Sequence, residues 1–243
     1  MPRQLSGGGR DNSGMWKQAW TECVTFVFPA RCLGCDQITE EERPLCSVCE
    51  PLVDWLDTAC PRCARPLSTS SVPCGACQLA PPPFSSTRSL ALYGGPIGEA
   101  LRRLKFGSRP DVAEPLGKLL GRLFVPIDVD LIVPVPLSSE RLAERGYNQA
   151  QLLSCAMRRR LPLAIRALRR ERPTARQAQL PIGARRQNVR GVFVADAKRV
   201  RDRCVLLVDD VLTTGETARS CARALLDAGA RRVDVLTAAR AMP

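Results

Sequence analysis

Eight of the twelve cysteines in this sequence form four C-x-x-C pairs, with ten residues between each pair and the next. A C-x-x-C turn brings two sulfurs to one tetrahedral ion, and two such turns supply the four thiolates of a closed structural zinc site. The chain contains no histidine, so any zinc must be held by sulfur alone. Four pairs therefore predict two zinc ions. The predicted ligands are Cys32, Cys35, Cys46, Cys49, Cys60, Cys63, Cys74 and Cys77.

Two questions about these cysteines stay open at the level of sequence. The spacing does not say whether neighbouring pairs share an ion or alternate pairs cross-brace. A redox role is an alternative, but four pairs in series lack the thioredoxin-like βαβ context of that chemistry. The other four cysteines, Cys23, Cys155, Cys204 and Cys221, stand isolated among apolar or helical residues, and we interpret them as core residues. Because residues 30–80 hold little apolar material, we expect them to fold only with metal bound.

The run V-L-L-V-D-D-V-L-T-T-G-E-T, residues 205–217, is the second group with chemical potential. It predicts a buried strand that delivers Asp209 and Asp210 to the carboxyl edge of a parallel sheet, followed by a turn that opens a helix. Free N–H groups around this turn, together with threonine hydroxyls, form a nest that suits a phosphate. The paired acids repel phosphate, so we expect them to face ribose hydroxyls or a Mg²⁺ shell. Alternatively, T-T-G-E-T is only a helix N-cap, which leaves the two acids unexplained.

The elements that must position these groups follow an α/β pattern from Ser86 onward. Apolar and β-branched runs predict strands at 88–93, 131–135, 191–194, 204–209 and 233–238. Helical periodicity predicts helices at 98–104, 117–123, 142–160 and 218–228, the last stopped by Gly229. The Arg-rich stretch 169–190 has no clean period, and a loop of that length is usually functional or mobile. The order of elements predicts a mainly parallel sheet.

Three segments are expected along the chain. Residues 1–15 are rich in glycine and serine and are expected to be disordered. Residues 16–83 combine an amphipathic helix, which ends at Pro29, with the cysteine-rich module. Three consecutive prolines at 81–83 form a stiff spacer, after which residues 84–243 form the α/β domain.

Composition and charge define the class of protein. The chain has 243 residues, 45% hydrophobic and 25% charged, and is long enough to bury a core. Residues 1–83 carry seven basic against nine acidic side chains, and residues 84–243 carry 29 against 15. Residues 155–190 hold eleven arginines and one acid, which creates a field that attracts phosphates or nucleic acid. A GC-rich genome is the plainer explanation of the overall arginine bias.

No membrane-spanning run or secretion signal is found, so we expect a cytoplasmic protein without membrane insertion.

At residues 205–217 the sequence resembles the phosphoribosyl-pyrophosphate signature of type I phosphoribosyltransferases. Three further matches narrow the resemblance to the ComF/GntX family over residues 16–240. They are the cysteine-paired N-terminus, P-V-P-L at 134–137, and R-L-A-E-R-G-Y-N-Q-A at 141–150. Five residues in and after the Arg-rich stretch complete the match: Gln177, Leu180, Arg185, Asn188 and Phe193.

The resemblance implies an α/β type I phosphoribosyltransferase fold, a parallel sheet flanked by helices with a hood, preceded by a small zinc-ribbon module with four-cysteine sites. It implies that Asp209 and Asp210 contact ribose and act in catalysis with Arg185. The implied 5′-phosphate-binding residues are Thr213, Thr214, Gly215, Glu216 and Thr217. The implied pyrophosphate-binding residues are Leu137, Ser138, Ser139, Arg141 and Arg145, and those of the closing hood loop are Gln177, Arg186 and Asn188.

The family is linked to natural competence and the use of imported DNA, and two functions follow. In the first, the protein is a Mg²⁺-dependent phosphoribosyltransferase. Purine-salvage relatives carry an acid where Thr213 stands, which disfavours a purine acceptor. In the second, the protein is a non-catalytic adaptor that holds single-stranded DNA and senses a nucleotide-like ligand.

Residues 155–190 contain no aromatic side chain, so they offer no stacking platform for single strands. A third interpretation is a degenerate fold kept as a scaffold, although the phosphate-binding run is intact. The expected partners are phosphoribosyl pyrophosphate or a nucleotide-like ligand, single-stranded DNA, and proteins of the competence machinery.

Overall fold

The computed structural model describes residues 29–40, 43–69, 72–123, 128–158, 161–171 and 192–242. Several sequence predictions lie outside these residues. They are the disordered segment 1–15, the helix at 16–27, and the implied hood residues Gln177, Leu180, Arg185, Arg186 and Asn188.

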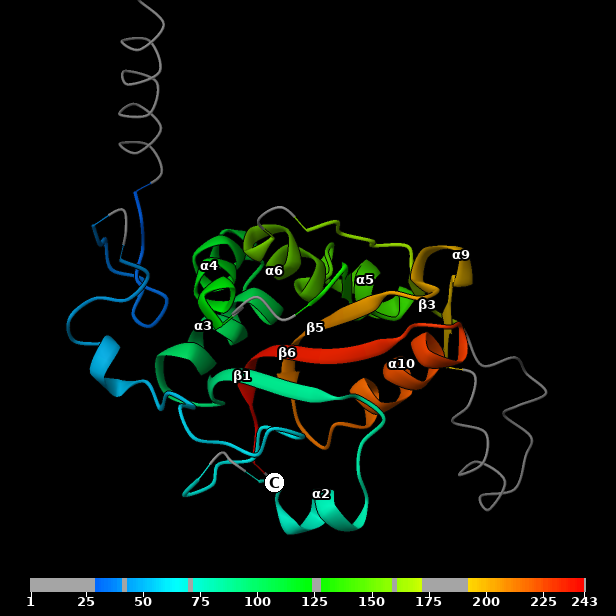
Figure 1. Ribbon diagram of the computed structural model, residues 1–243. Helices are drawn as coiled ribbons and strands as arrows, with labels where there is room; N and C mark the ends of the chain where they lie inside the picture. The colour runs from blue at the N-terminus through cyan, green and yellow to red at the C-terminus, as the bar shows by residue number, and fades with distance from the viewer. Residues whose placement is uncertain are drawn as a thin grey trace, which may run out of the picture.

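Four parallel strands form the central sheet, in the order β1, β6, β5, β2, and Figure 1 shows β1, β6 and β5 side by side. Their bounds are Ser86–Leu92 for β1, Leu131–Pro134 for β2, Cys204–Leu212 for β5 and Arg232–Arg240 for β6. β5 pairs with β6 on one side and with β2 on the other. Because the strands are parallel, the segments that follow β2, β5 and β6 meet at one edge of the sheet. The predicted parallel sheet is confirmed.

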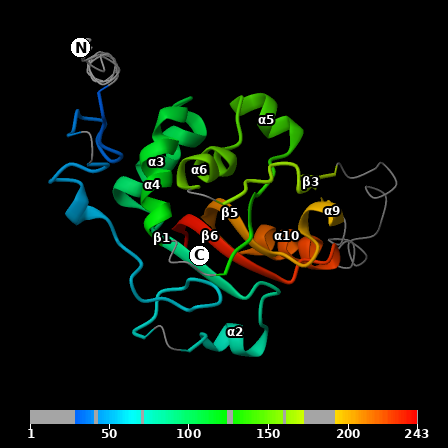
Figure 2. The ribbon, with the colours of Figure 1, turned by 45° about the horizontal axis from the view of Figure 1, so that its top comes forward.

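Helices cover both faces of the sheet, with α3 (Gly95–Phe106), α4 (Ala113–Leu123) and α6 (Gln149–Met157) gathered on one side in Figure 2. α10 (Glu216–Asp227) packs on the other face, with a short antiparallel pair, β3 (Leu168–Arg170) and β4 (Phe193–Ala195). Alternate residues of β5 serve the two faces: Leu206 joins the first core and Leu207 the second, as the pleat of a strand requires. The remaining elements are η1 (Glu50–Leu52), α2 (Gly75–Leu79), η2 (Pro110–Val112), α5 (Ser139–Arg145) and α9 (Ala197–Val200).

The single helix expected at 142–160 is wrong, because two helices, α5 and α6, occupy this region. Gly146 ends α5 with a left-handed φ of 76°, a conformation that glycine adopts without strain. Asn148 then caps α6, its side chain accepting a hydrogen bond from the Gln151 N–H. The sequence R-G-Y-N is therefore a C-cap followed by an N-cap.

Helices α4 and α6 approach closely at Gly117. A Cβ there would lie 2.5 Å from the Ala156 Cβ and 2.9 Å from the Leu153 carbonyl oxygen. We expect Gly117→Ala to lower the free energy of unfolding by about 1–3 kcal/mol, because the helices must separate. Gly121→Ala is the control, since its nearest neighbour would be the Met157 carbonyl oxygen at 3.4 Å. Urea denaturation checks both, and equal stability of the two variants would contradict the prediction.

The cysteine-rich module covers the outer edge of β1. Trp55 forms an antiparallel bridge with Ala91, and the Leu92 N–H donates to the Asp54 carbonyl at 2.9 Å. An uncovered edge strand presents free N–H and C=O groups that attract other chains. The segment between the second and third cysteine pairs therefore completes the sheet.

Candidate functional site

The eight paired cysteines form two separate four-sulfur clusters. Within each cluster the sulfurs lie within 4.8 Å of one another. Neighbouring pairs come together, so the question of pairing that the sequence left open is answered without cross-bracing. The first cluster holds Cys32, Cys35, Cys46 and Cys49, and the second holds Cys60, Cys63, Cys74 and Cys77.

The donor atoms of both clusters fit zinc. The Cys32 sulfur accepts hydrogen bonds from the N–H groups of Gly34 and Cys46, both at 3.3 Å, and the Cys60 sulfur accepts one from the Cys74 N–H at 3.2 Å. Burial raises the pKa of Cys32 and Cys60, but backbone N–H donors outweigh it and bring each pKa to about 7. Backbone donors thus favour the thiolate of one cysteine in each cluster, whereas burial raises the pKa of Cys49 and Cys77. No cysteine that the structure describes forms a disulfide, and clustering in fours favours metal over redox chemistry.

The unpaired cysteines differ from one another. Cys204 and Cys221 are buried, as expected for core residues. Cys155 is exposed, so its assignment to the core is wrong: the polar side of α6 carries it, whereas Leu153 and Met157 face the core. Cys23 lies outside the described residues.

The paired carboxylates lie near the carboxyl end of β5, which extends to Leu212, beyond the predicted end at Asp209. The Asp210 carboxylate forms an ion pair with the Lys105 ammonium at 3.0 Å, and these side chains are only 13% and 17% exposed. The Asp209 carboxylate accepts a hydrogen bond from the Asp210 N–H at 2.9 Å. Burial raises the pKa of Asp209 to about 7, and the charge of Asp210 adds to the rise. The ammonium of Lys105 therefore does not fully balance the negative charge of the two carboxylates, as expected where a cation or hydroxyl donors bind.

The raised pKa of Asp209 predicts how stability depends on pH. The folded chain holds a proton that the unfolded chain releases near pH 4, so stability falls as the pH rises from about 4 through 7. Asp209→Asn removes this effect and keeps the oxygen that accepts from Asp210. We expect its Tm to exceed that of the unsubstituted protein by about 3 °C or more at pH 8, and by less at pH 5. Thermal scans at both pH values test this, and a constant difference would disprove it.

The turn after β5 has the form expected for anion binding. Gly215 precedes α10 with a φ of 81°, and no side chain caps the first turn of the helix there. The side chain of the N-cap residue therefore does not cap the helix. The Glu216 N–H makes one long hydrogen bond, 3.4 Å, to the Thr214 hydroxyl. Thr213, Thr214 and Thr217 are exposed. Hydroxyls and free N–H groups thus surround the start of a twelve-residue helix.

The implied pyrophosphate residues follow β2, which is the neighbour of β5 in the sheet. Leu137 and Ser138 are half-buried, and the Ser138 hydroxyl caps α5 by accepting from the Arg141 N–H at 3.4 Å. Ser139 and the Arg141 side chain are exposed at the start of α5. The strand order therefore brings the segment after β2 beside the Asp209–Thr217 segment.

Arg145 is directed differently from Arg141. Its guanidinium lies 5.2 Å from the centre of the Phe106 ring and donates to the Gln149 side-chain oxygen at 3.3 Å. Its Nε is buried and has no hydrogen-bond partner. Arg145 thus stands over the end of α3, the helix that also supplies Lys105.

Two residues that contact the candidate site carry no signal in the sequence. Lys105 forms an ion pair with Asp210. In the sequence it stands out only as one of four lysines in a chain that has 32 arginines. Arg240, at the end of β6, donates to the main chain at the start of the turn before α10. No local pattern signals either contact.

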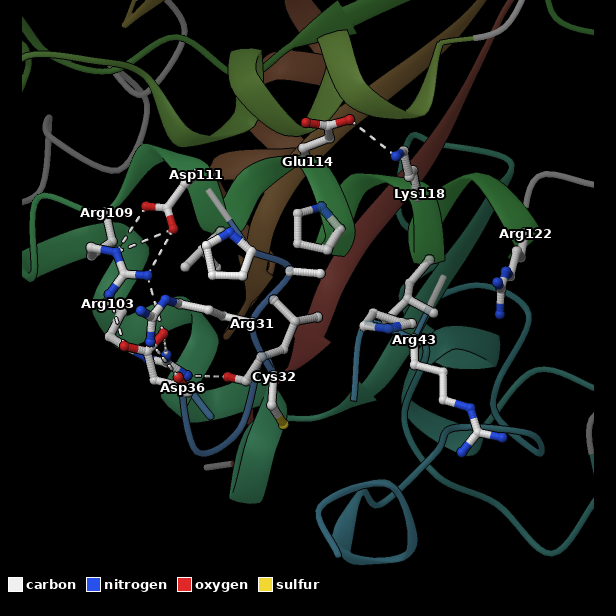
Figure 3. Close-up of a pocket in the computed structure, with 17 residues that line it drawn as sticks. Arg31, Cys32, Asp36, Arg43, Arg103, Arg109, Asp111, Glu114, Lys118 and Arg122 are labelled. Carbon is white, nitrogen blue, oxygen red and sulfur yellow. Dashed lines mark hydrogen bonds and ion pairs between the residues drawn. The ribbon is translucent and has the colours of Figure 1, made fainter. Parts of the chain in front are cut away.

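A hollow of about 950 Å³ lies elsewhere, between the first four-sulfur cluster and α3, η2 and α4 (Figure 3). Asp36 there pairs with Arg103 and Arg109, both at 3.0 Å, and Arg109 also binds Asp111 at 2.8 Å. The Arg109 hydrogen bonds lower the pKa of Asp36. None of the residues that line this hollow belongs to the sheet edge with Asp209. Its ion pairs fasten the first cluster to the α/β domain.

Comparison with known proteins matches a double zinc ribbon domain at residues 23–78 and a phosphoribosyl transferase domain at residues 118–242. The DNA utilization protein YhgH of Escherichia coli O157:H7 is 36% identical over 200 residues, which cover 79% of this chain and 88% of that protein. Competence protein F of Haemophilus influenzae is 30% identical over 229 residues, 88% of this chain and 98% of that protein.

The chain belongs to the ComF family.

This ComF-family protein is also 29% identical to competence protein ComFC of Bacillus subtilis, over 70% of this chain and 72% of that protein. The type I phosphoribosyltransferase fold behind a zinc-ribbon module with four-cysteine sites is thereby confirmed. Within the described ranges, no helix of this ComF-family protein combines the length and hydropathy that a membrane span needs.

Proposed function

We propose that this ComF-family protein binds phosphoribosyl pyrophosphate with Mg²⁺ and transfers the phosphoribosyl group to an acceptor. One observation carries the proposal: the strand order places the paired carboxylates, the free N–H groups before α10 and the segment after β2 at a single sheet edge. A phosphorylated sugar diphosphate presents hydroxyls, a monophosphate and a pyrophosphate, which match these three features.

Each group has a role in this proposal. Asp209 and Asp210 accept hydrogen bonds from the two ribose hydroxyls, and the turn around Gly215 receives the 5′-phosphate. Ser138 and Ser139 approach the pyrophosphate. Carboxylate oxygens suit Mg²⁺, which would neutralise charge on the departing pyrophosphate.

Lys105 balances part of the negative charge of the paired carboxylates. Its ion pair with Asp210 keeps one of the two neighbouring carboxylates balanced until a ligand arrives. Ribose hydroxyls donate to a carboxylate without removing its charge, so Lys105 stays close when ribose binds. It then lies where it also attracts the phosphates of the ligand.

In the proposed transfer, a nucleophilic atom of the acceptor bonds to C1 of the ribose while the bond from C1 to the pyrophosphate oxygen breaks. Pyrophosphate leaves with the electron pair, and the proton of the acceptor passes to solvent. Thr213 stands where purine-salvage enzymes carry an acid, so we propose an acceptor other than a purine base.

A role in the use of imported DNA is part of the proposal, since the related proteins are named for competence and DNA utilization. The alternative, a non-catalytic adaptor, is supported by the excess positive charge of residues 84–243. It predicts binding of single-stranded DNA that weakens with salt and is indifferent to substitutions at Asp209 and Asp210.

The experiment is a calorimetric titration of the zinc-loaded protein with phosphoribosyl pyrophosphate, with and without Mg²⁺, followed by single-stranded DNA in the same cell. Saturable heat that depends on Mg²⁺ supports the transferase and justifies a screen of amine and nucleotide acceptors for pyrophosphate release. Heat from DNA alone would overturn it in favour of the adaptor.

A further inference from the structure

Arg240 is a buried cation at the end of β6, with only 6% of its surface exposed. Its Nε donates to the Cys63 carbonyl at 3.1 Å. Its Nη1 donates to the Leu212 carbonyl at 2.9 Å and also to the Thr213 carbonyl. One guanidinium thus holds a zinc-ligand residue and the first residues of the phosphate-binding turn.

The Arg240 guanidinium is planar and its N–H groups are fixed in a fork, so it transmits displacement from one partner to the other. No carboxylate of the described residues forms an ion pair with it. A buried cation is stable only when its donors are satisfied. Nη1 also donates to the carbonyl of the adjacent Ala241 at 2.5 Å, so a shift of the Cys63 carbonyl disturbs a shared set of acceptors that includes Leu212 and Thr213.

A zinc ion bound by the second cluster would help to fix the position of the Cys63 carbonyl. The buried cluster of the second module consists of Cys60, Cys74 and Cys77, with only Cys63 and Leu67 packed against it. Thr87 of β1 donates to the Pro61 and Arg62 carbonyls, both at 2.9 Å, and ties that part of the turn to the sheet. The sulfurs are the main material of the core behind it, so loss of metal frees the side of the turn that carries Cys63. A zinc ion held by four thiolates also leaves the centre negatively charged, which favours a cation next to it.

The first four-cysteine centre is attached in another way. Its Leu33, Leu45 and Val53 belong to the large apolar core shared with α3 and α4. Arg103 donates to the Leu33 and Gly34 carbonyls, as Arg240 does to Cys63, but its described contacts do not reach the phosphate-binding turn. The two centres therefore differ in what they can influence.

We propose that Arg240 is a positioning residue that couples zinc occupancy of the second four-cysteine centre to the geometry of the phosphate-binding turn. Loss of this zinc loosens residues 212–217, whereas loss of the first zinc does not. Coupling is reciprocal, so a phosphate ligand in the turn slows release of the second zinc. This last consequence rests on the proposed function, because only there is the turn assigned to the 5′-phosphate.

The test is hydrogen exchange of the full chain, followed in peptides that span residues 205–220. We expect Cys77→Ser, which removes a ligand of the second centre, to speed exchange in residues 212–217 at least tenfold. Cys49→Ser, the matched change in the first centre, leaves it within twofold. Equal effects of the two variants, or none, would overturn the proposal whether or not a ligand binds.

Arg240 itself is tested by a double-mutant cycle. In an Arg240→Met background, Cys77→Ser should add less than twofold to the exchange rate, because the connection is already cut. Arg240→Lys keeps the charge and loses the fork, and should show partial coupling. Arg103→Met is the matched control and leaves the effect of Cys77→Ser at its full size. A full effect of Cys77→Ser in the Arg240→Met background would contradict the role of Arg240.

A separate titration of the unsubstituted protein with ribose 5-phosphate distinguishes the two proposals. We expect saturable binding that slows the transfer of one of two zinc ions to a chelating dye. Absence of binding speaks against the proposed function and leaves the exchange result to decide the coupling. Binding with unchanged release of both ions speaks against the coupling alone.

Discussion

Asp209→Asn combined with Asp210→Asn is expected to weaken binding of phosphoribosyl pyrophosphate by roughly 10²- to 10⁴-fold. Hydrogen bonds to charged groups contribute about 1.5–3 kcal/mol each, and two are lost together. The carboxylates lie at the sheet edge where the turn before α10 begins, next to the groups proposed to bind the 5′-phosphate. Calorimetric titration in the presence of Mg²⁺ gives both affinities.

The matched control is Asp128→Asn with Asp130→Asn. These acids lie before β2, at the amino edge of the sheet, where the Asp130 carboxylate accepts from the Cys204 N–H at 2.7 Å. The control removes the same formal charge, so a loss of affinity caused by overall electrostatics would appear in both variants. Affinity of the Asp209/Asp210 variant within tenfold of the unsubstituted protein would place the ligand elsewhere.

Removal of zinc with a strong chelator is expected to unfold residues 58–80 before residues 30–50. Structural zinc contributes about 10–16 kcal/mol to small zinc-dependent modules. The second centre has little buried apolar material besides its cysteines and Leu67, whereas Leu33 and Val53 anchor the first centre in the main core. The α/β domain keeps its own core through both losses.

Limited proteolysis with mass spectrometry measures the order of unfolding, and elemental analysis measures the metal. We expect two zinc ions per chain, early cleavage within residues 58–80, and resistance to cleavage within the strands β1, β2, β5 and β6. A single zinc per chain, or first cleavage within residues 30–50, would show that the two centres are not built as the clusters indicate.

The sequence determined the parts of this protein that depend on neighbouring residues. Four C-x-x-C turns at equal spacing indicated two metal centres, because both sulfurs of a pair come from one turn. The run 205–217 indicated a strand, two acids and an anion-binding turn, since hydrophobic pattern and turn residues are local signals. It did not reveal the break at Gly146, where a helical pattern continues across a cap.

Only the tertiary structure decided which groups meet. The partnership of Lys105 with Asp210 and that of Arg240 with Cys63, 177 residues apart, result from the packing of α3 against the sheet and of the second module against β6. The sharing of each metal centre by neighbouring cysteine pairs was settled in the same way. Such contacts leave no periodicity in the chain, because the sheet order and the docking of the module, and not the spacing of residues, bring their atoms together.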